Sequence, residues 1–150
     1  MNALVIFGQK IPQKENKWWQ QFDKVFAPSN LKEKLQEKKI DFIEIDDLVG
    51  SGNVQEAYLL ASKLPLPKSV DYQGFDLWWM HYDDIYYYFC LPYTQYCRLL
   101  SYLNNFEKVT IFQPPASYVF KYFLNAVNHQ CVILKENKLS QSISDFKVLK

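Results

Sequence analysis

The residues best suited to acid–base chemistry are His81, Asp83 and Asp84, which directly follow the apolar run 77–80. A histidine changes its charge near neutral pH, and two carboxylates beside it would favour the protonated imidazole. Such a group can act as a general acid or base, so we predict His81, Asp83 and Asp84 as catalytic residues. The same residues also fit structural roles, in which Asp84 caps the following helix, Asp83 faces solvent and His81 packs against an aromatic neighbour.

A second group of polar residues follows two other apolar runs. Gly8 ends the run 3–7 and is suited to a tight turn. Gln113 begins a loop whose proline pair, 114–115, leads to a helix starting at Ser117, and the free N–H groups of a helix start can bind a phosphate or a carboxylate. We predict substrate-binding roles for Gly8, Gln9, Lys10, Tyr82, Gln113 and Ser117.

The glycine-rich signatures of nucleotide sites are absent from this sequence. The segment 8–13, Gly-Gln-Lys-Ile-Pro-Gln, lacks the further glycines of a dinucleotide fingerprint and does not match a P-loop. Asp46 and Asp47 stand where a ribose-binding acid would stand, but they also fit a turn or a solvated surface. We therefore predict no nucleotide cofactor bound by this chain.

Cysteine and histidine usage argues against a metal site. Cys90, Cys97 and Cys131 form no Cys-x-x-Cys pair, and the two histidines, His81 and His129, lie far apart in the chain. A structural zinc site needs about four such ligands in clustered spacing. We expect no metal, and three free thiols that are mostly buried.

The composition predicts one globular domain over residues 1–150 without a membrane span. The chain is 49% hydrophobic, 17% aromatic and 22% charged, and it contains no apolar run of about 18 residues. Neither does it open with a secretory signal, so we expect a cytoplasmic protein. Residues 1–40, 41–90 and 91–150 carry net charges of +4, −7 and +4. The acidic middle argues against a nucleic-acid partner.

The order of apolar runs predicts the fold class. We expect strands at 3–7, 40–45, 75–82, 109–112 and 131–134, and helices at 17–26, 31–39, 53–64, 84–104 and 117–127, with a short helix and an extended piece in the tail. Of these strands, 75–82 is the most strongly predicted central one. Strands that alternate with helices predict an α/β fold: a Rossmann-like open, mostly parallel five-stranded sheet with helices on both faces.

This fold determines where a site should lie. Ligands of open parallel sheets bind beyond the carboxyl ends of the strands, where the strand order reverses. We therefore expect four clusters to share one rim of the sheet, namely residues 8–10, 46–47, 81–84 and 113–117.

Aromatic residues are concentrated between Tyr86 and Tyr96. Such a stretch fits a buried core, a contact with a second domain or a protein partner, or a surface on which a sugar stacks. We expect the first two more than the third, and keep a carbohydrate acceptor as a possible ligand.

Part of the chain resembles a known enzyme class. The run 72–79, Tyr-Gln-Gly-Phe-Asp-Leu-Trp-Trp, followed by a helix and then 107–112, Glu-Lys-Val-Thr-Ile-Phe, is similar to the third and fourth strands in the amino-terminal halves of GT-B type glycosyltransferases of surface-polysaccharide synthesis. The similarity covers about residues 70–135. It implies an acceptor-side domain, with the nucleotide sugar bound by a second Rossmann-like half, and no activity for this domain alone.

A second resemblance is to the small domain that precedes the ATP-grasp domain of glutathione-synthetase-like ligases. It rests on Asp76 to Asp84, Gln113 to Ser117 and the closing Val148 to Lys150, but Gln113 stands where that family has Asn. The remaining alternative is a complete, nonenzymatic binding or interaction module, because the chain carries no strong catalytic motif.

Overall fold

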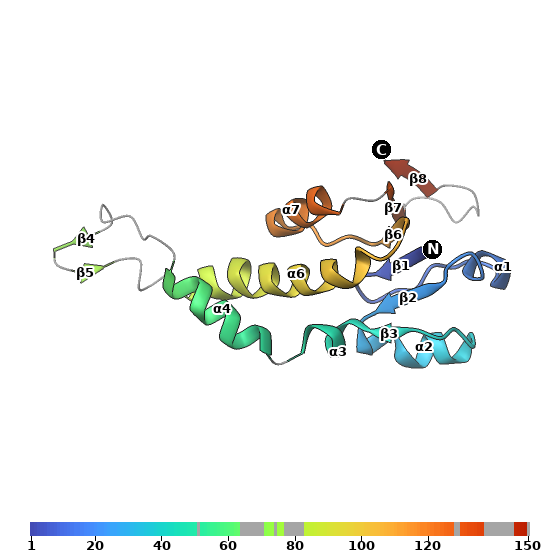
Figure 1. Cartoon of the computed structure of the whole chain (residues 1–150), viewed down its shortest axis with the longest axis horizontal. Helices are drawn as coiled ribbons and strands as arrows, with labels where there is room; N and C mark the ends of the chain where they lie inside the picture. The colour runs from blue at the N-terminus through green and yellow to red at the C-terminus, as the bar shows by residue number, and fades with distance from the viewer. Residues whose placement is uncertain are drawn as a thin grey trace.

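The computed structural model describes residues 1–50, 52–63, 71–73, 75–76, 83–127, 130–136 and 146–149. It has the α/β architecture expected from the sequence (Figure 1). The main sheet has the order β3-β2-β1-β6-β7-β8, in which the first five strands are parallel and the last pair is antiparallel. Its strands are β1 (Asn2–Ile6), β2 (Lys24–Ala27), β3 (Ile43–Glu44), β6 (Lys108–Phe112), β7 (Gln130–Glu136) and β8 (Phe146–Leu149).

The strand order reverses between β1 and β6. From β1 the chain proceeds outward to β2 and β3, then returns to the other side of β1 to form β6 and continues to β7. This is the topology of a Rossmann-like open sheet, and it places a switch point where the carboxyl ends of β1 and β6 lie side by side.

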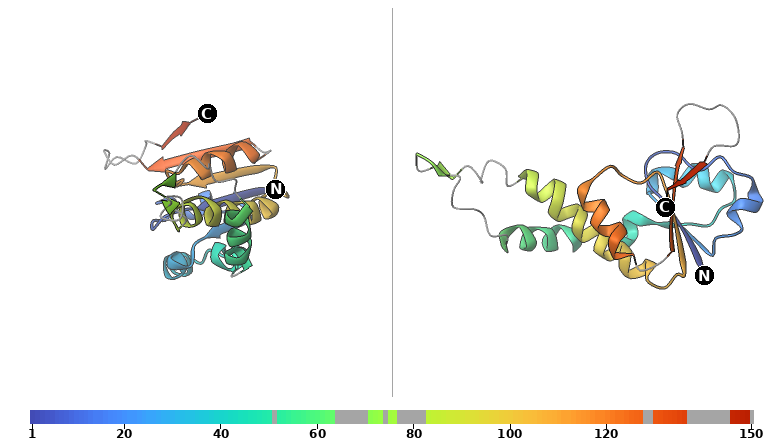
Figure 2. Two further views of the ribbon diagram at one scale, coloured as in Figure 1. Left: turned by 90° about the vertical axis from the view of Figure 1, so that its left-hand side faces the viewer. Right: turned by 90° about the horizontal axis from the view of Figure 1, so that it is seen from above.

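Helices cover both faces of the sheet, as the view from above in Figure 2 shows. On one face lie α1 (Asn16–Trp19), the 3-10 turn η1 (Ser29–Leu31) and α2 (Lys32–Glu37); on the other lie α3 (Ile45–Val49), α6 (Leu91–Leu103) and α7 (Tyr118–Ala126). Successive residues of β1 belong to two separate hydrophobic cores, one on each face of the sheet. Leu4 and Ile6 pack toward α2, whereas Ala3 and Val5 pack toward α6 and α7.

A helical arm projects away from the sheet (Figure 1). It consists of α4 (Gly52–Lys63), the π-helical turn η3 (Tyr86–Cys90) and the start of α6, and it has its own small core around Ala57, Ala61, Tyr86 and Cys90. Arg98 of α6 connects α3 with α4, since its guanidinium donates to the Val49 carbonyl and pairs with Glu56 at 2.9 Å. In the described part of the chain, no helix combines the length and apolar character needed to cross a bilayer.

The predicted helix 17–26 is wrong. Its apolar residues recur at helical spacing, yet α1 ends at Trp19 and the chain turns before forming β2. The three apolar residues of β2 point alternately, because Val25 and Ala27 pack on the α2 side and Phe26 packs on the opposite side. Burial on both faces favours an internal parallel strand over a one-sided helix.

The prediction that 75–82 forms a central strand is also wrong for the residues that the structure describes. Phe75 and Asp76 form β5, which pairs antiparallel with β4 (Asp71–Tyr72) in a separate two-stranded sheet. Gln73 in the intervening turn has a positive φ of 51°, typical of a tight hairpin that folds the chain back. Residues 77–82 lie outside the described part.

Other elements agree with the sequence analysis in kind, with shifted bounds. The predicted strand 40–45 is reduced to β3 and continues as α3, and the helix predicted from residue 31 starts with η1 at Ser29. Asn30 lies inside this 3-10 turn. The strands predicted at 109–112 and 131–134, and the helix that begins after Ser117, are confirmed.

Candidate functional site

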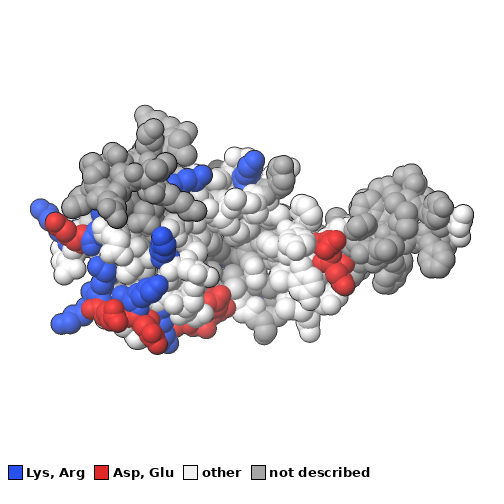
Figure 3. All heavy atoms as spheres, turned by 180° about the vertical axis from the view of Figure 1, so that it is seen from behind, with Lys and Arg blue, Asp and Glu red and all other residues white. Residues whose placement is uncertain are grey.

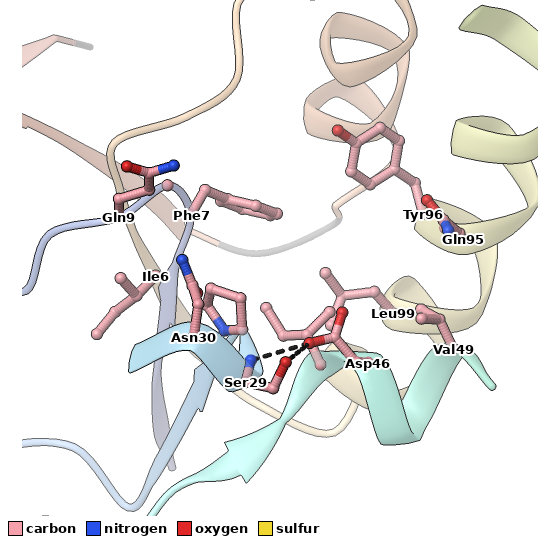
Figure 4. A pocket seen from close by; sticks show the side chains of 13 residues that line it. Ile6, Phe7, Gln9, Ser29, Asn30, Asp46, Val49, Gln95, Tyr96 and Leu99 are labelled. Carbon is pink, nitrogen blue, oxygen red and sulfur yellow. Dashed lines mark hydrogen bonds between the residues drawn. The ribbon is translucent and has the colours of Figure 1, made fainter. Parts of the chain in front are cut away.

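A pocket of about 500 Å³ opens at the carboxyl edge of β1, β2 and β3, beside the switch point (Figure 4). The loops after these three strands form one side of it, and α3 and α6 form the other. Its lining residues are Ile6, Phe7, Gly8, Gln9, Pro28, Ser29, Asn30, Ile45, Asp46, Val49, Gln95, Tyr96 and Leu99. We call it the polar pocket, because amide, hydroxyl and carboxylate groups alternate with apolar side chains around it.

Asp46 is the acidic group of the polar pocket. One of its oxygens accepts hydrogen bonds from the backbone N–H of Ser29 at 2.9 Å and from the Ser29 hydroxyl at 2.7 Å. These hydrogen bonds, the backbone one first, hold the pKa of Asp46 below its ordinary value. The second carboxylate oxygen points into the pocket (Figure 4), where it can accept hydrogen bonds from a ligand.

At the switch point the side chain of Gln113 lies close to Gly8. Gly8 has a φ of +84°, and a Cβ placed on it would lie 3.0 Å from Oε1 of Gln113. Gln113 also has a positive φ, 54°, so the backbone turns sharply after both β1 and β6. In dinucleotide-binding folds the pyrophosphate approaches the backbone at this place. Here the Gln113 side chain covers it.

Two aromatic rings form the inner wall of the polar pocket. Phe7 and Tyr96 meet edge to face, with ring centroids 6.4 Å apart. Burial raises the pKa of Tyr96, and a hydrogen bond with Ser117 opposes that rise, so the phenol stays protonated at neutral pH. Neutral rings of this kind offer apolar faces and edges beside the hydrogen-bonding groups.

Gln9 and Lys10, the two polar residues of the loop after β1, line different cavities. Gln9 lines the polar pocket, and its backbone carbonyl accepts a hydrogen bond from the Lys34 ammonium of α2 at 3.1 Å. Lys10 lines a different cavity, with Lys34, Glu37 and Lys38. The structure therefore brings Gly8 and Gln9 to the predicted site and places Lys10 elsewhere.

Asp83 and Asp84, two residues of the predicted catalytic cluster, do not lie at this rim. Asp83 and Asp84 are exposed at the start of the helical segment that continues through η3 into α6, and neither lines the polar pocket. His81 and Tyr82 lie outside the described residues. Asp83 and Asp84 do not follow a central strand of the main sheet, because β5, the described strand before them, belongs to the separate two-stranded sheet.

Gln113 and Ser117 lie near the predicted rim and have structural partners there. Gln113 packs over Gly8, and the Ser117 hydroxyl accepts a hydrogen bond from the Phe120 N–H at 3.1 Å, capping α7. Neither residue lines the polar pocket. Their predicted substrate-binding roles remain predictions.

Sequence reasoning missed most of the residues that complete the site. Ser29 and Asn30 follow β2, whose residues have the apolar spacing of a helix, and Gln95 and Tyr96 come from α6 across the pocket. The first two could have been found from the run 25–27, because a polar pair directly after an internal strand lies at the carboxyl edge. Nothing local marks Gln95, since its position depends on how α6 packs.

No cluster of three or more His, Cys, Asp or Glu side chains suited to a metal ion occurs in the part of the chain that the structure covers.

Comparison with known proteins identifies no relative: no protein-family model, no curated protein and no solved structure matches the chain significantly. The arguments for function therefore come from the pocket and its chemistry.

Proposed function

We propose that this chain is the acceptor-side domain of a GT-B type glycosyltransferase, and that the polar pocket holds a neutral saccharide. The observation that carries this proposal is the chemistry of the lining: Gln9, Ser29, Asn30, Asp46 and Gln95 supply hydrogen-bonding groups, and none of the residues that line the pocket is Lys or Arg. Together with the aromatic wall, this lining suits a ligand rich in hydroxyl groups and without negative charge.

Each kind of group has a counterpart on a sugar. Amide side chains both donate and accept, so they match a hydroxyl in either sense, and a carboxylate accepts from one or two hydroxyls. The rings of Phe7 and Tyr96 match the apolar C–H faces of a sugar ring. A phosphate-bearing ligand would instead need cations or a cradle of backbone N–H groups.

The nucleotide sugar is assigned, under this proposal, to a second Rossmann-like domain. The turn after β1 lacks the glycines of a phosphate-binding loop, and the side chain of Gln113 covers Gly8 where a pyrophosphate would approach. The exposed Tyr87 and Tyr88 on η3, 58% and 69% accessible, offer a contact surface for that second domain.

The test is a binding comparison by calorimetry on the whole chain. One panel contains neutral saccharides, namely the methyl β-glycosides of glucose, galactose, mannose and N-acetylglucosamine; the other contains UDP, GDP, CDP and ATP. We expect saturable binding of at least one saccharide and none of a nucleotide. Gln9→Ala should weaken saccharide binding about tenfold, the effect of one lost hydrogen bond.

Gln13→Ala is the matched control, because Gln13 lines the other cavity with Lys10. It should leave saccharide binding unchanged. Binding of ATP or of a nucleoside diphosphate that Gln9→Ala weakens, with no saccharide bound, would contradict the proposal and favour the ligase-type alternative.

A further inference from the structure

A second, apolar pocket of about 660 Å³ lies between α4, α6 and α7. Its lining is Leu60, Phe89, Cys90, Tyr93, Tyr96, Cys97, Leu100, Val119, Tyr122, Phe123 and Ala126. None of these residues is Lys, Arg, His, Asp or Glu, and the polar atoms among their side chains are those of phenol hydroxyls and thiols. The volume is within the range of about 300–1,000 Å³ that small-molecule sites occupy.

The apolar pocket combines a buried floor with an exposed mouth. Cys90, Val119 and Phe123 are almost completely buried, whereas Phe89, Tyr93 and Tyr122 are about half or more exposed, at 51%, 49% and 72%. Large apolar side chains that line a concavity while they remain open to water favour a ligand that covers them.

The charged side chains of the described residues are unevenly distributed over the surface. On the face that Figure 3 shows, the Lys, Arg, Asp and Glu side chains gather over the sheet and at the far end of the described arm, with mostly uncharged surface between them. The lining of the apolar pocket contains no Lys, Arg, Asp or Glu with which an ionic ligand could pair, whereas a hydrocarbon needs no such partner.

Tyr96 lines both the polar pocket and the apolar pocket. On one side its ring centroid lies 6.4 Å from that of Phe7, which lines the polar pocket, and on the other 5.2 Å from that of Phe123, which lines the apolar pocket. A site lined by amide, hydroxyl and carboxylate groups and a site lined by apolar groups thus share the Tyr96 side chain.

We propose that the two pockets bind one amphiphilic acceptor, with its sugar in the polar pocket and its hydrocarbon chain in the apolar pocket. This inference rests on the proposed function, because it takes the polar pocket as a saccharide site. It adds the class of the acceptor: a glycoside with an apolar aglycone, either a straight alkyl chain or a branched isoprenoid.

The experiment compares methyl, hexyl and octyl β-D-glucopyranosides and β-D-galactopyranosides, each below its micelle concentration, by calorimetry on the whole chain. Each methylene that enters an apolar pocket strengthens binding roughly twofold to fourfold. We therefore expect the octyl glycoside to bind at least tenfold more tightly than the methyl glycoside. Geranyl glucoside in place of the octyl compound tells a branched chain from a straight one.

Two variants of α7 locate the effect. Ala126→Trp fills the apolar pocket from an exposed position, whereas Asn125→Trp places the same bulk on a neighbouring exposed residue outside the lining. Ala126→Trp should abolish the gain from the longer chain and leave the methyl glycoside affinity unchanged. Asn125→Trp should retain the gain.

The outcomes separate this inference from the function on which it rests. Binding of methyl glycosides without any gain from the alkyl chain would overturn the amphiphile proposal and leave the saccharide site intact. Failure of every glycoside, with octanol still bound at the apolar pocket, would contradict both. A dimer that Ala126→Trp dissociates would show that a second copy of the chain fills the pocket, and would overturn the inference as well.

Discussion

The Asp46 carboxylate joins the loops that follow two neighbouring strands. It accepts hydrogen bonds from both the N–H and the hydroxyl of Ser29, at 2.9 and 2.7 Å, and so connects the end of β2 with the start of α3. The same carboxylate presents its other oxygen to the polar pocket (Figure 4). The geometry of the site therefore depends on the charge of Asp46.

The stability of the chain should reflect that charge. The folded-state pKa of Asp46 is lowered, mainly by the Ser29 backbone hydrogen bond, so its stabilising effect is present above the unfolded value of about 3.9 and is lost as pH falls through the folded value. Asp46→Asn should cost about 1 kcal/mol or less near pH 7, because the group is exposed, and the cost should shrink below pH 4.

Urea unfolding at pH 7, 5 and 3 measures this difference. Asp47→Asn, which changes the same net charge on the adjacent exposed residue, is the control. A destabilisation by Asp46→Asn that stays the same at all three pH values would show that the charge of Asp46 is not what stabilises the loop.

Gly8 should resist substitution for two separable reasons. Its φ of +84° strains any other residue by about 1–2 kcal/mol, and a Cβ would lie 3.0 Å from Oε1 of Gln113. Gly8→Ala should therefore cost about 2–3 kcal/mol. At Gly50, with a φ of +56° and a nearest atom at 3.7 Å, the same substitution should cost only the backbone strain.

A double-mutant cycle with Gln113→Ala tests the contact. Truncation of Gln113 removes the crowding, so the cost of Gly8→Ala should fall by about 1 kcal/mol in that background. Additive effects of the two substitutions on the free energy of unfolding would show that the loops do not touch in solution.

Ser117 caps α7 and also hydrogen-bonds Tyr96, and the loss of its hydroxyl should be measurable. Ser117→Ala removes the acceptor of the Phe120 N–H, so we expect a loss of about 1 kcal/mol, and Ser117→Asp, which restores an acceptor, should retain most of the stability. Ser101→Ala is the matched serine control, since the Ser101 hydroxyl donates to the Arg98 carbonyl within α6 and caps no helix start, and it should change stability by less than about 0.5 kcal/mol. Equal costs at the two serines would exclude a capping role.

The three thiols should differ in their reactivity. Cys97 is exposed, whereas burial raises the pKa of Cys90 and of Cys131 and lowers their thiolate fraction at neutral pH. A disulfide reagent at pH 7.5 should label one thiol at least about tenfold faster than the other two. Cys97→Ser should remove the fast phase, and a fast phase that persists in this variant would contradict the described burial.

The sequence predicted the architecture better than its individual elements. Strands 3–7, 109–112 and 131–134 were found because apolar residues on both faces leave one interpretation, and Ser117 was found because a proline pair precedes it. The run 17–26 failed because its aromatic residues satisfy helical spacing, while the burial of Val25 and Phe26 on opposite faces depends on tertiary packing.

The site was predicted only where the strand that leads into it was predicted correctly. Gly8 and Gln9 follow a correctly predicted strand, and they line the polar pocket. The rim position expected for Asp83 and Asp84 depended on a central strand over residues 75–82. The described part of that run is the short strand β5 outside the main sheet, and the two aspartates lie on the arm. Tyr96 needed the packing of α6 between the two pockets, which no local pattern encodes.

The central claim is that the polar pocket binds a neutral saccharide, and the most direct measurement is an amide chemical-shift titration of the isotopically labelled chain. Saccharides of the calorimetry panel and UDP are added separately. The account predicts saturable shifts for Gly8, Gln9, Ser29, Asn30 and Asp46 with a saccharide and none there with UDP. Shifts of these amides with UDP alone, or saccharide-induced shifts confined to Lys10, Gln13 and α2, would contradict it.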